Sequence, residues 1–445
     1  MAQLLGKAGY SISVDPEKAG VLIVNTCGFI GPAKEESLQV LSELAAQKTH
    51  DQVLIAAGCL TQRYGVEVAR QVPGIDGIIG TRRWMDIVDV VQQLRQGQHP
   101  QPIYHLPNEP KTVVDEGSVQ RVAIQGASAY IKIADGCRRP CAFCAIPLIK
   151  GTAVSRPIDS ILDEASMLQD IGVKEIILIA QDTTDYGHDL GVKDGLADLL
   201  EKLVERLNMD QAGNDSAPEG VSWIRVMYAY PGYVTDRMID VMAAHSKIVP
   251  YLDIPLQHAD PGVLRRMRRP ANIDWVHRTL AKMRQSIENL AIRTTFIVGY
   301  PGETEEEFQN LLDFIEEIRF DRVGAFQFSF EPGTYSEALG DPIPAEVKQE
   351  RWEEVMVLQQ GISLQKNQAL VGKELEVLIE GQGDGLSMGR TYRDAPEIDG
   401  LTIVEGEIPI GEMVPVRITG AMTYDLSGVL AGEGSPLSFV ELDPT

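Results

Sequence analysis

The chain has 445 residues, enough for two or three domains that each have a core of their own. Hydrophobic residues make up 44% and charged residues 23%, and no apolar run reaches the roughly 18 residues of a membrane helix. The N-terminus lacks the long apolar segment of a secretory signal, so we expect a cytoplasmic protein with no membrane partner. A formal net charge of −24 is unfavourable for gripping phosphate backbones and favours a basic partner.

The first hundred residues alternate short apolar strands with helices. Strands are expected at 21–24, 53–57 and 75–79. A helix is expected after each strand: at 32–47 after the first, ending near residue 71 after the second, and at 83–96 after the third. This alternation predicts a parallel sheet covered by helices, in a first α/β domain of residues 1–98. Gln, Pro and charged residues without periodicity follow, so we expect a linker at 99–124.

Strand–helix repeats then resume, and six of them can be counted. The strands are expected near 129–134, 175–180, 223–229, 251–255, 292–298 and 322–330. Six repeats predict a partial βα barrel over residues 125–366, with an open doubly wound sheet as the alternative. After a long helical stretch at 345–370, short strands separated by Gly and Asp predict a small antiparallel β-barrel or sandwich at 367–440.

The strongest chemical signal is a loop directly after the first barrel strand, Cys137-Arg-Arg-Pro-Cys141-Ala-Phe-Cys144. Three thiolates in one loop can bind three irons of a 4Fe–4S cluster and leave the fourth iron open to another ligand. Arg138 and Arg139 are expected to place positive charge beside this anionic cluster. A structural zinc site is the alternative, but zinc normally needs four ligands, and no His or fourth Cys lies nearby.

Polar or Gly-rich motifs follow the other barrel strands as well. The loops after the strands of a βα barrel share one rim, where active sites are assembled. His258, after the fourth strand, fits a satisfied polar contact better than a ligand. Gly after a strand more often marks only a turn, but a shared rim with the cysteine loop favours a role in binding. Five residues are therefore candidates for the surroundings of the cluster's ligand: Gln181, Asp182, Gly299, Gly302 and Glu303.

The remaining two cysteines end neighbouring strands of the first domain. Cys27 lies in Val-Asn-Thr-Cys-Gly-Phe-Ile, and Cys59 in Ala-Ala-Gly-Cys-Leu. The ends of adjacent parallel strands meet at one sheet edge, so the two thiols are expected there together. Taken alone, the pair is also compatible with two unrelated buried thiols. An odd total of five cysteines argues against a disulfide framework.

Together these motifs resemble the methylthiotransferase family of the radical S-adenosylmethionine (SAM) superfamily, over nearly the whole chain. The C-terminal β domain is similar to a TRAM domain. The resemblance implies that the open iron binds SAM, that an electron donor drives its cleavage to a 5′-deoxyadenosyl radical, and that the five rim residues surround SAM. It also implies a second 4Fe–4S cluster, held by three N-terminal cysteines, that delivers the inserted sulfur, and a second SAM that provides the methyl group.

Three stretches resemble the RimO branch of this family more than the MiaB branch, at 179–183, 251–258 and 392–400. RimO enzymes methylthiolate the β-carbon of an aspartate in the twelfth protein of the small ribosomal subunit, whereas MiaB enzymes act on a modified adenosine in transfer RNA. Residues 369–445 contain four Lys and Arg against fourteen Asp and Glu, but an RNA-binding module should be basic. We therefore expect the ribosomal protein as partner and no stable RNA binding, with a transfer RNA methylthiotransferase as the alternative.

The N-terminus departs from the family pattern. The family's first N-terminal cysteine follows an initial strand, but here the chain opens with Met-Ala-Gln-Leu-Leu-Gly-Lys, which reads as the end of the next helix. We therefore expect the extreme N-terminus, and with it the third ligand of the second cluster, to be lacking. Cys27 and Cys59 would then remain as its ligands. A non-catalytic iron–sulfur protein that has lost its second cluster is a further interpretation.

Overall fold

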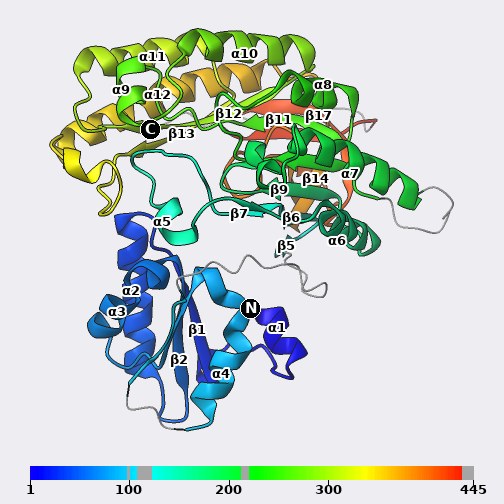
Figure 1. The fold of residues 1–445 in the computed structure, drawn as a ribbon. Coiled ribbons are helices and arrows are strands. Elements are labelled where there is room, and N and C mark those ends of the chain that lie inside the picture. The colour runs from blue at the N-terminus through cyan, green and yellow to red at the C-terminus, as the bar shows by residue number, and fades with distance from the viewer. Residues whose placement is uncertain (98–100, 108–122, 212–219, 433–445) are drawn as a thin grey trace.

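The computed structural model describes residues 1–97, 101–107, 123–211 and 220–432. Three units follow one another along the chain: an α/β unit, a larger α/β unit and a closed β-barrel (Figure 1). This architecture confirms the fold class that the sequence predicts. In the described residues, no helix is both long and apolar enough to cross a bilayer. The expected end of the last domain at 440 lies outside the described residues.

The first unit is a parallel sheet in the order β1-β2-β3-β4, with helices on both faces. Its strands are β1 (Val21–Thr26), β2 (Val53–Gly58), β3 (Gly77–Gly80) and β4 (Ile103–His105). Its helices are α1 (Ala2–Lys7), η1 (Pro16–Lys18), α2 (Gly31–Gln47), α3 (Cys59–Gln71), η2 (Thr81–Asp86) and α4 (Ile87–Arg95). β4 was not expected, because three residues within a stretch that reads as linker are too few to show a periodicity.

The central unit contains six parallel strands and an antiparallel edge strand, in the order β13-β12-β11-β10-β9-β6-β5. The strands of this sheet are β5 (Ala123–Gln125), β6 (Ser128–Lys132), β9 (Glu175–Ile179), β10 (Trp223–Val226), β11 (Ile248–Asp253), β12 (Ala291–Val298) and β13 (Arg322–Gln327). Six parallel strands confirm the predicted six-unit partial barrel. Along β6, Ala129 and Ile131 join the helix-covered core, so Ser128, Tyr130 and Lys132 belong to the opposite, inner face.

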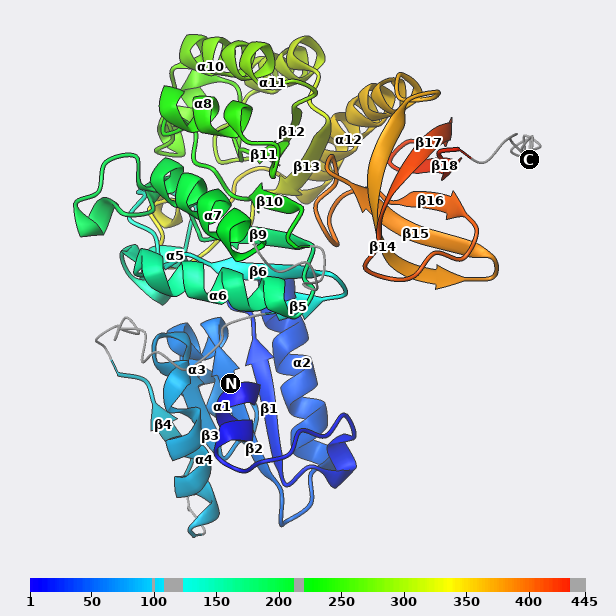
Figure 2. The same ribbon diagram turned by 90° about the vertical axis from the view of Figure 1, so that its right-hand side faces the viewer.

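Helices cover the outer face of the central sheet (Figure 2). On the inner face, Trp223 and Tyr251 belong to a second apolar cluster that includes Leu378 of the C-terminal unit. The helices are α5 (Ile146–Lys150), α6 (Ile158–Asp170), η3 (Thr183–Asp185), η4 (His188–Leu190), α7 (Gly195–Gln211), α8 (Asp236–Ala244), α9 (Pro261–Arg266), α10 (Ile273–Ser286), α11 (Glu305–Ile318), η5 (Glu337–Leu339) and α12 (Ala345–Gln368). A two-stranded ribbon of β7 (Ala134–Asp135) and β8 (Val154–Ser155) brackets the cysteine loop and α5. The ribbon therefore fixes both ends of the loop that carries the chemistry.

The C-terminal unit is the predicted small barrel, closed in the order β14-β15-β16-β18-β17. Its strands are β14 (Glu374–Gly383), β15 (Leu386–Thr391), β16 (Thr402–Glu405), β17 (Met413–Ala421) and β18 (Leu426–Leu430). The expectation of a wholly antiparallel barrel is corrected at one pair: β18 is antiparallel to β17 but parallel to β16. Figure 2 shows this barrel beside the central sheet, while the first unit adjoins a different side of the central unit.

Candidate active site

The cysteine loop lies between β7 and α5 and is held by backbone hydrogen bonds to two neighbours. The N–H of Cys137 donates to the carbonyl oxygen of Gly151 just after α5 (3.1 Å). The N–H of Ala142 donates to the carbonyl oxygen of Met267 just after α9 (2.8 Å). Gly136 enters the loop with a φ of 78°, a conformation open mainly to glycine. The three thiols are therefore presented by a loop fixed at its start and middle.

Cys137 is buried, and Cys141 and Cys144 are partly buried. Burial raises the pKa of Cys137 to about 11 and that of Cys144 to about 12. The sulfur of Cys141 lies 3.8 Å from the hydroxyl of Tyr230 and 3.5 Å from a guanidinium nitrogen of Arg269. Metal ligation requires thiolates, so cluster binding at this loop is coupled to loss of the thiol protons.

The donor set fits an iron–sulfur cluster better than a single zinc ion. Across the described ranges of the chain, no three Cys, His, Asp or Glu side chains converge on a point that could hold one metal ion. In an iron–sulfur cluster each thiolate binds its own iron, so the ligands surround the cluster instead of converging. The three loop cysteines are free thiols of the right type and spacing for this arrangement. Three thiolates are also one fewer than the four ligands that a structural zinc site normally has.

The positive charge expected beside the cluster is already balanced by carboxylates. Arg138 makes a bidentate pair with Asp185, at 2.6 and 2.7 Å. The Nε of Arg139 donates to Asp182 at 2.5 Å, and its guanidinium lies 3.6 Å from the ring centroid of Tyr233. Both arginines lie in or beside the cysteine loop, as expected, and each is paired with a carboxylate. Asp182, one of the five rim candidates, reaches the cysteine loop through Arg139.

The rim candidates after β12 form a closed turn. Glu303 is fully buried and accepts hydrogen bonds from the N–H of Gly299 (2.5 Å) and from Arg351 (2.7 Å). Its other oxygen lies 2.8 Å from Nε2 of His258, whose Nδ1 accepts from a backbone N–H. Gly299 and Gly302 both have positive φ, 70° and 78°. His258 is thus a satisfied polar contact, and Glu303 holds the turn from the inside.

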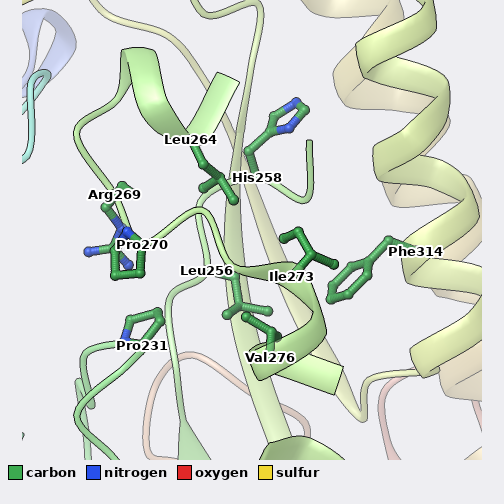
Figure 3. A pocket seen from close by; sticks show the side chains of 9 residues that line it. All are labelled: Pro231, Leu256, His258, Leu264, Arg269, Pro270, Ile273, Val276 and Phe314. Atoms are coloured by element: carbon green, nitrogen blue, oxygen red, sulfur yellow. The ribbon is translucent and has the colours of Figure 1, made fainter. Parts of the chain in front are cut away.

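A narrow pocket lies behind the loop that carries Arg269 (Figure 3). Arg269 and Pro270 stand at one end and Phe314 at the other, and most of the remaining lining is apolar. The guanidinium of Arg269 also donates to the carbonyl oxygen of Pro255. The pocket therefore lies behind the arginine that contacts Cys141.

The two cysteines of the first unit lie at the same sheet edge, as expected. In the β1–β2 pairing, Thr26 is opposite Gly58, so Cys27 and Cys59 follow paired positions. The backbones touch here, because a Cβ added at Gly28 would lie only 2.6 Å from the Cα of Leu60. Cys27 is exposed and Cys59 partly buried. Burial raises the pKa of Cys59.

A buried ion pair joins this edge to the rim of the central barrel. Arg63 of α3 donates to Glu331 at 2.8 Å, and both side chains are buried. The same guanidinium donates to the carbonyl oxygens of Gly28 (3.1 Å) and Pro332 (2.7 Å). Lys34 reaches Glu331 as well, at 2.6 Å. The turn that follows Cys27 is thereby fixed against the loop after β13.

Several residues of the site were missed by sequence reasoning. Lys132 and Lys150 both contact Asp135, at 2.6 and 2.8 Å. Burial lowers the pKa of Lys132 to about 8, which leaves it largely protonated at neutral pH. Tyr230 and Arg269 were also not assigned to the cluster loop. One sequence signal could have identified Lys132: it is a charged residue within the apolar stretch Ala129–Ile133, just before the cysteines.

A partial βα barrel with a three-cysteine loop after its first strand defines the class of this protein, a radical SAM enzyme. The Radical SAM superfamily matches residues 131–315, and the TRAM domain matches residues 371–430. The Uncharacterized protein family UPF0004 matches residues 1–80. The chain therefore uses an iron–sulfur cluster and SAM. The non-catalytic interpretation has no support.

Relatives named "Ribosomal protein uS12 methylthiotransferase RimO" match the chain over nearly its full length. The relative from Roseiflexus sp. (strain RS-1) is 46% identical over 96% of this chain and 93% of its own length. The relative from Chloroflexus aurantiacus is 47% identical over 96% and 95%, and that from Aquifex aeolicus 42% identical over 96% and 92%. The chain belongs to the RimO family of methylthiotransferases, as its motifs predicted.

Solved structures support the fold at much lower identity. The radical SAM methyltransferase TsrM from Kitasatospora setae, with tryptophan substrate and a SAM analogue bound, gives a TM-score of 0.52 at 13% identity. The match covers 85% of this chain and 68% of TsrM. At this identity the likeness concerns the fold alone.

Proposed function

We propose that this chain methylthiolates the β-carbon of an aspartate in ribosomal protein uS12. The observation that carries the proposal is that the three cysteines of the barrel loop and the two cysteines of the first unit lie on either side of the same contact between the two units. The sheet edge with two thiols is joined by Arg63 and Glu331 to the loop after β13. That loop in turn donates a backbone hydrogen bond from Ser336 to Ala142, in the barrel loop with three thiols (2.9 Å). The names of the relatives supply the substrate, and their 42–47% identity over nearly the whole length supports its transfer to this chain.

In this proposal, Cys137, Cys141 and Cys144 hold a 4Fe–4S cluster whose open iron binds SAM. When bound, the pair supplies a 5′-deoxyadenosyl radical that removes a hydrogen atom from the substrate carbon, after reduction by an external electron donor. Tyr230 and Arg269 flank the sulfur of Cys141 and hold it in place. Burial of the loop keeps water away from the reacting atoms.

We assign the SAM surroundings to the five rim candidates. Gln181 has the most direct support, because its side-chain oxygen is buried and has no hydrogen-bond partner among the described residues. Such an acceptor is costly unless a ligand satisfies it. Asp182 acts through Arg139, and Glu303 shapes the turn that contains Gly299 and Gly302.

We further propose that Cys27 and Cys59 are ligands of a second iron–sulfur cluster, which delivers sulfur. Their close approach at one sheet edge supports this role.

The partner in this proposal is a basic ribosomal protein in the cytoplasm, and stable RNA binding plays no part. The acidic composition of the C-terminal segment supports a protein partner over RNA, since residues 369–445 contain four Lys and Arg but fourteen Asp and Glu. Opposite charges steer such partners together and are screened by salt.

The test offers both substrates to the same preparation. The reconstituted protein is incubated with SAM and a one-electron reductant, once with ribosomal protein uS12 and once with transfer RNA. Mass spectrometry should find a methylthio group on an aspartate of the protein and none on the RNA. Modification of transfer RNA alone would replace the proposed function with the MiaB-type activity.

A further inference from the structure

A compact group of opposite charges lies beside the cysteine loop and has no part in holding the cluster. We call Lys132, Asp135 and Lys150 the lysine cluster. Lys132 is the last residue of β6, and Lys150 is the last residue of α5. Each ammonium donates one hydrogen bond to a different oxygen of Asp135, at 2.6 and 2.8 Å. The two lysine side chains are 24% and 15% exposed.

The lysine cluster lies between the two sets of cysteines. On one side, Gly151, next to Lys150, accepts the hydrogen bond from the N–H of Cys137. On the other side, Arg82 of the first unit donates to the carbonyl oxygens of Leu148 and Ile149, at 3.0 and 2.8 Å. α5 also packs against α3, whose first residue is Cys59. Lys150 is thus held between the radical-generating loop and the edge that carries Cys27 and Cys59.

The charges of the lysine cluster do not balance. Two ammonium groups share one carboxylate, which leaves an excess of one positive charge. An ammonium has three donors, and each lysine uses one of them on Asp135. A mostly buried cation is unfavourable unless a further anion compensates it. In a chain of net charge −24, this local excess is a specific feature rather than a general property of the surface.

We propose that Lys132 and Lys150 form the subsite that binds the carboxylate of the substrate aspartate. This inference rests on the proposed function, in which the reacting β-carbon is bonded directly to that carboxylate. The carbon must lie between the cluster loop, which provides the radical, and the second cysteine pair, which provides sulfur. Its carboxylate then lies within reach of the lysine cluster, where charge-assisted hydrogen bonds orient the Cβ–H bond. Asp135 keeps the two ammonium groups in place.

The experiment compares two peptides from the substrate loop of ribosomal protein uS12. One carries the target aspartate, and the other has asparagine there, which has the same shape but no charge. The aspartate peptide is the substrate, and the asparagine peptide is a competing ligand. Lys150→Gln is compared with the unchanged chain, with Lys150→Arg, and with Lys48→Gln. Lys48 is a matched control, because it and its partner Asp76 are 15% and 33% exposed, as are Lys150 and Asp135.

In the unchanged chain, the aspartate peptide should bind more tightly than the asparagine peptide by about tenfold or more. Lys150→Gln should remove most of this preference and raise KM for the aspartate peptide. Lys150→Arg should restore part of it, and Lys48→Gln should leave it unchanged. A loss of folding in Lys150→Gln would lower binding of both peptides equally, and iron content per chain checks for it.

An unchanged preference in Lys150→Gln overturns the inference and leaves the proposed function standing. Weaker SAM binding with an unchanged preference assigns the lysine cluster to the carboxylate of SAM, which also overturns it. No modification of the aspartate peptide by the unchanged chain defeats the proposed function first, and the inference with it. The three failures are therefore distinguishable in one set of measurements.

Discussion

The two ends of the central barrel both bury charged side chains, but they use them differently. Near the beginnings of the strands, Glu175 accepts hydrogen bonds from Arg225 and Arg390, each at 2.6 Å, and all three side chains are at most 1% exposed. Arg390 also donates to Glu380 at 2.6 Å, so two carboxylates balance two guanidinium groups. Near the ends of the strands, the three thiols of the cysteine loop are free to bind metal, and the lysine cluster has one more positive than negative charge. We call the end around Glu175 the sealed end and the end around the cysteine loop the open end. Both ends bury charged groups, but only at the sealed end do the charges balance.

The sealed end is where the C-terminal unit attaches. Arg225 donates to the carbonyl oxygen of Tyr392 (2.8 Å), and the hydroxyl of Tyr251 donates to Asp399 (2.7 Å). Asp394 pairs with Arg322. The stretch 392–400, one of the RimO-like motifs, therefore packs against the chain's own barrel. Its two aspartates are buried there and are not a surface for a basic partner.

The largest effect is expected at the open end. Replacing Cys137, Cys141 and Cys144 together with Ala removes every protein ligand of the SAM-binding cluster. Reductive cleavage of SAM should fall to background, because no iron remains to bind and reduce it. The measurement is 5′-deoxyadenosine formed per chain with a chemical reductant. Undiminished formation would show that the reactive end of the barrel is misassigned.

The second cysteine pair should separate the two halves of the reaction. Cys27→Ala with Cys59→Ala leaves the barrel loop intact, so SAM cleavage should continue. Methylthiolation of uS12 should fall by about a hundredfold or more, since such ligands govern cluster retention and activity. The measurement pairs 5′-deoxyadenosine with the methylthio product in one assay. Loss of both together would mean that the pair supports folding and not sulfur delivery.

The sealed end should respond in stability. Arg390→Met leaves Glu175 short of one partner in a fully buried site, which should lower the free energy of unfolding by about 3 kcal/mol or more. Arg417→Met is the matched control in the same unit, since its pair with Glu374 is largely exposed and should cost about 1 kcal/mol or less. Urea unfolding of both variants gives the comparison. Equal losses would contradict the distinction between buried and exposed pairs.

Acid should act on the sealed end through Glu175. Burial alone would raise the pKa of this carboxyl, but Arg225 and Arg390 outweigh burial and lower its pKa to about 2. The folded pKa is depressed, so this stabilisation is present above the ordinary value of 4.5 and is lost as pH falls from 4.5 toward 2. The full loss is about 3 kcal/mol. Unfolding midpoints between pH 6 and 3 should therefore fall less steeply in Glu175→Gln, and an identical slope would contradict this account.

Much of this molecule could be predicted from local patterns. Strand–helix alternation predicted both α/β units, and Gly- and Asp-rich turns predicted the barrel. The spacing of Cys137, Cys141 and Cys144 predicted the cluster loop, because the loop is continuous in sequence. The shared edge of Cys27 and Cys59 followed from the geometry of parallel strands.

What escaped prediction depends on contacts between distant segments. The pairing of Arg139 with Asp182 spans 43 residues, and that of Arg63 with Glu331 spans 268. No periodicity reports such pairs, so the carboxylates that balance the arginines of the cysteine loop could not be predicted. The lysine cluster escaped for the same reason, since Lys150 becomes informative only once it lies beside Asp135 and between the two domains.

The central claim is that the open end of the barrel activates the β-carbon of an aspartate for methylthiolation. The most direct measurement uses a uS12 peptide deuterated at that carbon, with SAM and a one-electron reductant, and follows the label by mass spectrometry. The account predicts deuterium in the 5′-deoxyadenosine and a methylthio group on the same carbon of the peptide. A methylthio product with the label absent from 5′-deoxyadenosine, or with all deuterium still on the β-carbon, would contradict it.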